Sequence, residues 1–247
     1  MPKRKFTFEN AAVYHILTRA IEGKRIFEDQ ADCYRFIFQI YAANIGRPAS
    51  SLRRQNIVGA AKLILEGKSL PSELVVKEHS PLVYILSFVL VGNHYHFEMV
   101  QNFENGIPRY MQRLNVGFVN YFNLRHARKG PLFERRYTAI PIETLFQSDA
   151  LLRYINVKNV LDLYQPGWRE DGLRNIEDAL VFLKEYPFSS FPDLFGERRS
   201  MILPPKEILK HYLGEEFLKD KNNNINFVES YLNQELTDSS PIFLEEK

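Results

Sequence analysis

Residues 82–100 read LVYILSFVLVGNHYHFEMV and contain the two strands on which the predicted fold depends. The first half, Leu82–Val91, is almost continuously apolar, which is typical of a buried central strand. Gly92-Asn93 is a turn signal. After the turn, polar and apolar residues alternate, so the second strand places His94 and His96 on the same face.

Further elements are predicted on both sides of this hairpin. Apolar periodicity of 3.6 indicates helices and mixed-face runs indicate strands. The resulting order βαββαβ predicts an α+β protein with a ferredoxin-like antiparallel sheet and helices on one face. Residues 44–81 interrupt this order as a predicted insertion, with a short helix near Ile57–Leu65. The remaining predicted elements are strands over Val13–Ala20 and Leu132–Ile142 and helices over Asp29–Ala43, from Gly106 onward and over Glu143–Val160.

The chain after residue 160 has a different character. Helical patterns near residues 175–184, 206–213 and 227–236 are joined by links rich in proline and asparagine. The charge also changes sign, because residues 1–160 are strongly basic and residues 161–247 acidic, although the whole chain has a net charge of only +2. We therefore expect a domain over 1–160 and a mainly helical, acidic C-terminal extension over 161–247. A basic body favours a polyanionic partner.

Composition excludes several classes of protein. A hydrophobic fraction of 45% and a charged fraction of 25% are ordinary for a globular chain. The longest apolar run is about half of the roughly twenty residues that a membrane helix requires. Cys33 is the single cysteine, so it forms no internal disulfide, and a reducing cytoplasmic location is expected.

His94 and His96 are the first candidates for chemistry. Imidazoles two residues apart on a strand can converge on one cation, although two hydrogen-bonded histidines would have the same spacing. Glu98 shares their face and is able to add an oxygen ligand. On the first predicted strand, His15 and Arg19 alternate with Tyr14 and Thr18, and they would approach the histidines only if that strand is a neighbour in the sheet.

Tyr154 and Lys158 are the second candidates. They lie one turn apart on a predicted helix and so share a face. A tyrosine with an ordinary pKa of about 10 needs activation before it attacks phosphorus. A neighbouring ammonium group and a metal ion would both favour the phenolate. The chain has 13 tyrosines, and most tyrosines serve packing or interfaces.

A basic and aromatic stretch, RHARKGPLFERRY, runs from Arg125 to Tyr137. Arginine and lysine neutralise phosphates, and aromatic rings stack on unpaired bases. A solvated, charged loop would have the same composition, so the stretch leaves both interpretations open.

Taken together, these segments resemble the HUH single-tyrosine transposases, and most closely the REP-associated tyrosine transposases. The segment GNHYHF is similar to the Pro-Asn-His-hydrophobic-His segment of that family. The individual motifs are short, but their joint order and spacing are specific, and the similarity covers roughly residues 10–195. The other motifs follow in the family's order: MQRLN from Met111, YFN from Tyr121, RKG from Arg128, LF at Leu132, RY at Arg136 and RYI from Arg153.

The resemblance implies a DNA transposase that cuts and rejoins single-stranded DNA through a 5′-phosphotyrosine intermediate. It assigns Tyr154 as the nucleophile and His94 and His96 as ligands of a divalent cation, Mg²⁺ or Mn²⁺. The implied substrates are single strands that carry palindromic hairpins. Candidate DNA contacts are Arg113, Arg128, Lys129, Arg135 and Arg136.

One departure from the family falls in this site. The third metal ligand of the family is an amide one turn after the tyrosine, and that position is Lys158 here. A protonated lysine cannot bind a cation, so Lys158 would instead activate Tyr154 or contact phosphate. Either Glu98, Asn159 or water completes the metal shell, or activity is reduced or lost.

Two other classes of function are compatible with these residues. A decayed transposase would bind nucleic acid without cutting it, and a structural zinc protein would unfold on chelation. Within the family, some members exchange tyrosine helices in a dimer and others act as monomers, so the resemblance implies either a monomer or a homodimer.

Overall fold

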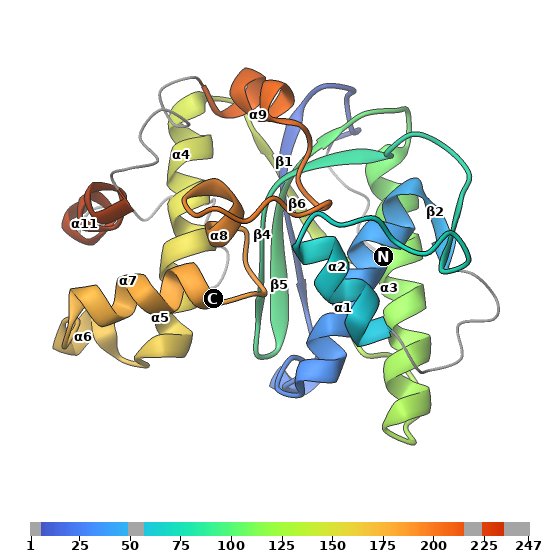
Figure 1. Cartoon of the computed structure of the whole chain (residues 1–247), viewed down its shortest axis with the longest axis horizontal. Coiled ribbons are helices and arrows are strands. Elements are labelled where there is room, and N and C mark those ends of the chain that lie inside the picture. The colour runs from blue at the N-terminus through green and yellow to red at the C-terminus, as the bar shows by residue number, and fades with distance from the viewer. Residues whose placement is uncertain (1–5, 49–56, 215–223, 235–247) are drawn as a thin grey trace.

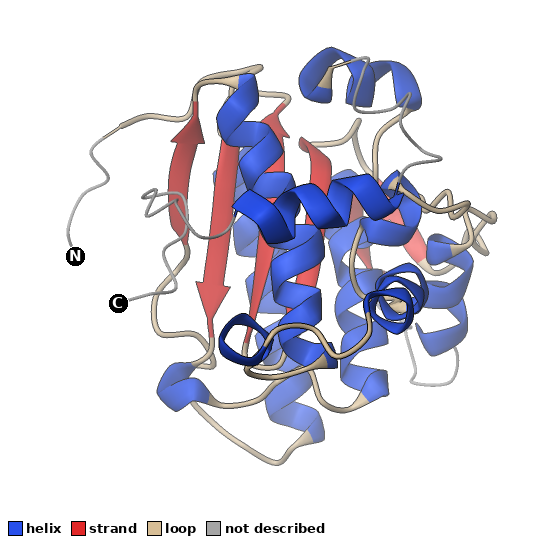
Figure 2. Ribbon diagram, turned by 90° about the vertical axis from the view of Figure 1, so that its left-hand side faces the viewer, coloured by secondary structure: helices blue, strands red, loops and turns tan. Residues whose placement is uncertain are grey.

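The computed structural model describes residues 6–48, 57–214 and 224–234. Its main sheet has four strands in the order β4-β5-β1-β6, and each neighbouring pair is antiparallel. The strand predicted as central, β4, lies at the edge of this sheet and is buried because residues 188–190 run along it. Figure 2 shows these strands running side by side. Helix α1 (Gln30–Ile45) lies between β1 and β4 in the chain, and α3 (Gly106–Arg125) lies between β5 and β6. The predicted ferredoxin-like order is confirmed. The strands are β1 (Val13–Arg19), β4 (Val83–Val91), β5 (His94–Gln101) and β6 (Thr138–Ile142).

The register of β1 against β5 divides the sheet into two different faces. His15 lies opposite Glu98, and Arg19 lies opposite His94. Directly opposed residues point to the same side of a sheet, so one side carries His15, Arg19, His94, His96 and Glu98. We call this side the histidine face. The other side, with Tyr14, Ile16, Tyr95 and Phe97, is called the aromatic face.

Helices α1 and α3 both cover the aromatic face, as predicted for the helices of this fold (Figure 1). Asp29 begins α1 as its N-cap, because its carboxylate accepts a hydrogen bond of 2.7 Å from the Ala31 amide. The buried stripe of α3, which includes Met111, Leu114 and Phe118, packs into the same core as Phe97. The two helices and this face therefore form the main hydrophobic core.

The histidine face is covered by the segment predicted as one helix over 143–160. The segment is divided into α4 (Leu145–Arg153), a π-helical turn η2 (Tyr154–Lys158) and α5 (Asn159–Tyr164). Thr144 and Gln147 form a capping box at the start of α4. The Asn159 backbone N–H and side-chain amide both donate to the Tyr154 carbonyl. This reach over five residues explains the wide turn, a geometry that is frequent at functional sites.

The insertion contains α2 (Ile57–Leu65), which coincides with the predicted short helix. Its two short strands, β2 (Gly46–Pro48) and β3 (Val75–Lys77), pair with each other away from the main sheet. Residues 49–56 of the predicted insertion lie outside the described residues. Helix α2 packs against α1, so the insertion extends the helical layer on the aromatic face.

The predicted strand over 132–142 is shorter in the structure and begins at Thr138. Before it, the Leu132 carbonyl accepts from the Ile21 amide in the short turn η1 (Ile21–Gly23), and the Glu134 amide donates to the Arg19 carbonyl. The chain around Arg135 therefore lies beside the end of β1 that pairs with His94.

The part after residue 160 is helical, as predicted, and contributes to the core on the histidine face. Residues 188–190 lie along the edge of β4, where the Leu90 amide donates to the Phe188 carbonyl and the Ser190 amide to that of Phe88. The division at 160/161 stays a prediction. The helices are α6 (Trp168–Asp171), α7 (Ile176–Glu185), α8 (Phe191–Leu194), α9 (Lys206–Leu213) and α11 (Asn224–Gln234); residues 235–236 of the last predicted helix lie outside the described residues.

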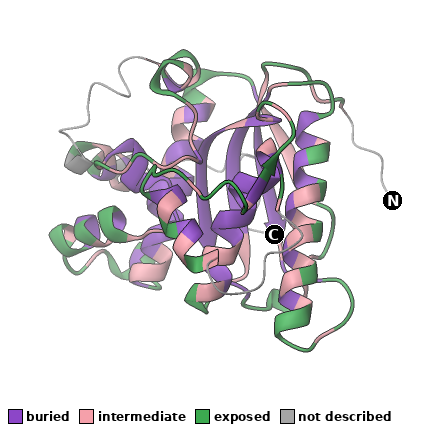
Figure 3. Cartoon of the chain, turned by 45° about the vertical axis from the view of Figure 1, so that its right-hand side comes forward, coloured by how far each residue is buried: buried purple, intermediate pink, exposed green. Residues whose placement is uncertain are grey.

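Burial follows this layered arrangement. Figure 3 shows buried strands at the centre and exposed surfaces on the outer sides of the helices. Among the described residues, no helix has both the length and the apolar character required to cross a bilayer.

Candidate active site

His94 and His96 lie at the start of β5, and their ring centroids are 5.0 Å apart. His96 is fully buried in the sheet, whereas His94 is half-buried at the strand end. The alternation of the strand thus places both imidazoles on one face, as the sequence predicts.

Hydrogen bonds orient both imidazoles through Nδ1. His94 Nδ1 lies 2.6 Å from Asn93 Oδ1, which can only accept, so this Nδ1 donates. His96 Nδ1 lies 2.9 Å from His15 Nε2. An imidazole that donates from Nδ1 has its lone pair on Nε2, and this arrangement with an outer hydrogen-bond partner is usual for metal-binding histidines. His94 therefore fits the role of a cation ligand, and His96 fits it in the tautomer whose Nδ1 donates to His15.

Tyr154 lies over the same face. Its ring centroid is 5.4 Å from that of His96 and 6.3 Å from that of His15. The tyrosine comes from the first residue of η2, 58 positions after His96 in the chain, and is 3% exposed. The structure therefore brings the predicted nucleophile and the predicted ligands together.

Lys158 is the last residue of η2 and lies beside the tyrosine. Its Nζ is 4.9 Å from the Tyr154 ring centroid, which is a cation–π distance. The same Nζ forms an ion pair of 3.1 Å with Asp162, one turn further along. Asp162 is in turn held by a hydrogen bond of 2.9 Å from the Trp168 indole. These contacts fix a positive charge next to the phenol ring.

Glu98 and Asn159 were the protein groups predicted as possible third ligands. Burial raises the pKa of Glu98 to about 8, the Ser148 hydrogen bond lowers it and the Asp149 charge raises it. When no cation is bound, the carboxyl group is therefore mostly protonated at neutral pH. The Asn159 amide group donates to the Tyr154 carbonyl. In the described ranges, no group of three or more His, Cys, Asp or Glu side chains is arranged to hold a metal.

The predicted basic contacts lie in two places. Arg113 on α3 bonds to the Gly46 carbonyl at 2.9 Å and contacts His79, so it joins the insertion to the aromatic-face layer, away from Tyr154. Arg128 bonds to Asn123 and to the Pro131 carbonyl within its own loop. Lys129, Arg135 and Arg136 are exposed, and the last two follow the contact of Glu134 with the end of β1.

Asn93 and Asp162 have roles in the site that the sequence interpretation missed, and His15 has one that depended on the strand order. Asn93 orients His94, and the only signal was its place in the Gly-Asn turn. His15 contacts His96, which follows once β1 is known to be the neighbour of β5. Asp162 pairs with Lys158, and the spacing of four residues on a helix was a usable signal for this ion pair.

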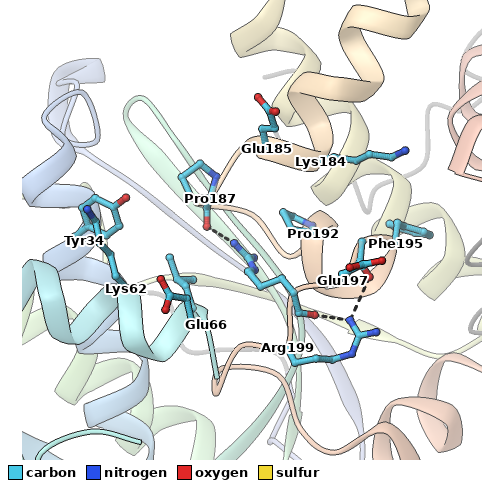
Figure 4. Close-up of a pocket in the computed structure, with 13 residues that line it drawn as sticks. Tyr34, Lys62, Glu66, Lys184, Glu185, Pro187, Pro192, Phe195, Glu197 and Arg199 are labelled. Atoms are coloured by element: carbon cyan, nitrogen blue, oxygen red, sulfur yellow. Dashed lines mark hydrogen bonds between the residues drawn. The ribbon is translucent and has the colours of Figure 1, made fainter. Parts of the chain in front are cut away.

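A cavity of about 1000 Å³ lies elsewhere, between the insertion and the C-terminal part. Figure 4 shows Tyr34, Lys62 and Glu66 on one side and Lys184 and Glu185 on the other. Its lining mixes acidic and basic side chains and shares no residue with the histidine face.

The chain was compared with known proteins. No protein-family model matches it, and no curated protein matches it. Among solved structures, a REP-associated tyrosine transposase bound to a REP hairpin has a TM-score of 0.46 and 10% sequence identity, over 83% of this chain and 93% of that chain. The likeness is distant.

Proposed function

We propose that this protein is a single-tyrosine DNA endonuclease and strand transferase that acts on single-stranded, hairpin-bearing DNA. The observation that carries the proposal is the meeting of Tyr154 with His96 at a ring distance of 5.4 Å, next to His94. A phenol and two oriented imidazoles are the groups that this chemistry requires. The sequence motifs that resemble the HUH family supply the same three residues independently.

In the proposed reaction the Tyr154 oxygen attacks a backbone phosphorus in line with the departing 3′ oxygen. The phenol loses its proton, a 5′-phosphotyrosine bond forms, and the P–O3′ bond breaks as the released 3′ oxygen gains a proton. Attack by another 3′-hydroxyl reverses these changes and joins the strands. No nucleotide cofactor is needed, because the covalent link retains the bond energy.

His94 and His96 would hold a divalent cation, Mg²⁺ or Mn²⁺, through Nε2. When bound, such a cation polarises the phosphoryl oxygens and neutralises charge that develops on them. Water and substrate oxygens would complete its shell, since burial raises the pKa of Glu98 to about 8. Lys158 beside the phenol would favour its ionised form.

The three central side chains come from a single chain, so the proposed reaction needs no residue from a second copy. Exposed Lys129, Arg135 and Arg136 lie in the loop beside the end of β1 and would attract the DNA backbone. The proposed setting is the cytoplasm, where single-stranded DNA is formed.

The test is formation of a covalent protein–DNA adduct. The protein is incubated with a labelled single strand that carries a hairpin and unpaired flanks, with Mn²⁺ or with EDTA, and the products are separated under denaturing conditions. We expect an adduct that requires Mn²⁺ and is lost in Tyr154→Phe. Tyr164→Phe is the matched control, because Tyr164 follows in α5 but packs on Phe182. Cleavage that persists in Tyr154→Phe would reject this nucleophile.

A second function, nucleic-acid binding without cleavage, is favoured by one observation. Lys158 occupies the place of the family's amide ligand and is paired with Asp162. If this alternative holds, the wild-type protein binds the same oligonucleotide in a salt-dependent manner, forms no adduct, and His94→Ala leaves the affinity unchanged.

A further inference from the structure

Arg19 occupies a special position in the sheet. It is the last residue of β1 and lies directly opposite His94 on β5. Side chains of such antiparallel partners point to the same face, with Cβ atoms about 5 Å apart. Arg19 therefore shares the histidine face with the proposed cation ligands. It is also the one arginine of that strand, since the rest of β1 is Val-Tyr-His-Ile-Leu-Thr.

The backbone around Arg19 is braced on both sides. Its carbonyl accepts from the Glu134 amide, and the next amide, that of Ala20, donates to the Asn93 carbonyl at 2.8 Å. Asn93 also orients His94. The Arg19 backbone is thus held in fixed relation to the proposed ligand, while the side chain is half-buried and reaches solvent.

Within the part of the chain that the structure describes, no carboxylate is paired with this guanidinium group. Among residues 6–48, 57–214 and 224–234 the structure records no ion pair or hydrogen bond for the Arg19 side chain. Other arginines in this part of the molecule differ: Arg25 is paired with Glu28 at 2.7 Å, and Arg153 with Asp149 at 2.7 Å. A half-buried cation on a reactive face, without a partner of its own, has its donors available for a ligand.

We propose that Arg19 binds the phosphodiester that Tyr154 attacks, by donating hydrogen bonds to its non-bridging oxygens. The inference rests on the proposed function and adds a substrate-binding residue to it. Arginine suits this role because its planar fork donates two parallel hydrogen bonds to phosphate and is always charged. The contact strengthens as charge develops on those oxygens in the transition state.

The experiment compares Arg19→Gln and Arg19→Lys with wild type in two measurements. The first is the affinity for a labelled single-stranded oligonucleotide in EDTA, over a series of salt concentrations. The second is the rate of adduct formation with Mn²⁺. Arg25→Gln is the matched control, because Arg25 lies near the same turn, where its Nε would be 3.8 Å from a Cβ at Gly92, but it is paired with Glu28.

We expect Arg19→Gln to weaken binding by roughly tenfold or more, the loss typical of a hydrogen bond to a charged group. The slope of log affinity against log salt should decrease by about 0.7, as expected for one lost phosphate contact with a single strand. The rate of adduct formation should decrease by a larger factor than the affinity does. Arg19→Lys should retain part of the affinity and part of the adduct rate, because lysine keeps the positive charge but lacks the two parallel donors of the guanidinium group. Arg25→Gln should change neither measurement by more than about twofold, in line with surface charges away from a contact.

Equal effects of Arg19→Gln and Arg25→Gln, or an unchanged salt slope in Arg19→Gln, would overturn the proposal. If the wild-type protein forms no adduct, the proposed function fails, but the affinity measurement still decides whether Arg19 contacts phosphate. Thermal unfolding of each variant in the absence of DNA shows whether the fold is retained.

Discussion

The two faces of the main sheet are made by the same strands but contain different chemistry. On the aromatic face, Tyr95 and Phe97 are fully buried under α1 and α3. On the histidine face, His96 and Glu98 are equally buried, under α4 and η2. Burying a polar group costs free energy unless it is hydrogen-bonded, and an apolar residue would be the simpler choice there. Both faces pack hydrophobic cores, and the polar groups buried on the histidine face are what the proposed function accounts for.

Several separate hydrogen bonds hold the polar groups of the histidine face. His15 contacts His96, and the Ser148 hydroxyl donates to Glu98. At Ser87 on β4, the hydroxyl accepts a hydrogen bond from the Asn156 side chain, which in turn accepts one from the Ser190 hydroxyl. These contacts link the sheet to η2 and to the part after residue 160. The comparison of the two faces can be tested by substitutions that are neighbours in sequence but point to opposite sides.

The largest expected contrast is between His96→Ala and Phe97→Ala. His96→Ala should lower adduct formation more than about 100-fold, because removing a metal ligand exceeds the loss typical of its outer partners. Phe97→Ala should destabilise the fold by about 3–5 kcal/mol, as expected for a fully buried ring. Adduct assays and denaturant unfolding, run on both variants, separate the two effects.

For this pair, adduct formation is measured at a temperature below the unfolding transition of Phe97→Ala, so that both variants are folded in the assay. If His96→Ala keeps its adduct and is destabilised as strongly as Phe97→Ala, the histidine face is structural and the comparison is wrong.

A smaller effect is expected for His15, which contacts a proposed ligand but does not itself bind the cation. His15→Ala should weaken Mn²⁺ binding and slow adduct formation by about 10- to 100-fold, the range for outer partners of metal-binding histidines. Metal affinity is measured by Mn²⁺ titration, and stability by thermal unfolding. A purely structural role would change only the unfolding.

His15→Gln serves as the conservative control, since its amide can still form a hydrogen bond with His96 Nδ1. Partial recovery of Mn²⁺ affinity in His15→Gln supports orientation of the ring. Equal metal affinity in wild type and His15→Ala would show that the contact at 2.9 Å has no part in metal binding.

Much of this arrangement could be predicted from the sequence. A continuous apolar run located β4, and alternation located β5 and placed His94 and His96 on one face, because both are local properties of the sequence. The short helix α2 was placed at its observed bounds, since its apolar run is flanked by clear breaks. The order βαββαβ was enough to predict the sheet topology.

Other features depend on long-range contacts and could not be predicted. The contact of His15 with His96 joins residues 81 positions apart and requires knowledge of strand order. The π turn depends on where the Asn159 side chain finds an acceptor, and helical periodicity does not reveal this. The raised pKa of Glu98 results from burial and, to a smaller extent, from the nearby Asp149 charge, which no local pattern encodes.

Glu98 allows a test of the histidine face by pH. Burial raises its pKa from 4.5 to about 8 in the folded chain, so between these values the folded state binds more protons than the unfolded state. Stability therefore decreases as the pH rises through this window, by at most about 1.4 kcal/mol per pH unit from this group. Glu98→Gln cannot ionise and should lose this dependence.

Urea unfolding of wild type and Glu98→Gln at pH 5 to 9, in EDTA, measures the effect. The stability of wild type relative to Glu98→Gln should decrease between pH 5 and 8 and level off above. A constant difference across the whole range would show that Glu98 is ionised in the folded protein at all these values.

The smallest expected effect concerns Lys158 and sharpens the comparison within the histidine face itself. Lys158→Gln puts an amide where the resembling family has a ligand and removes the ammonium next to Tyr154. If metal binding limits the reaction, Mn²⁺ affinity and adduct rate should both rise by a few-fold. If the charge activates Tyr154, the Mn²⁺ affinity rises but the adduct rate falls, most clearly at low pH, where the phenolate is scarcest.

Lys158→Met removes the charge without adding a ligand, so it separates these two contributions. A rate unchanged in both variants would mean that the ion pair with Asp162 only holds η2 in place.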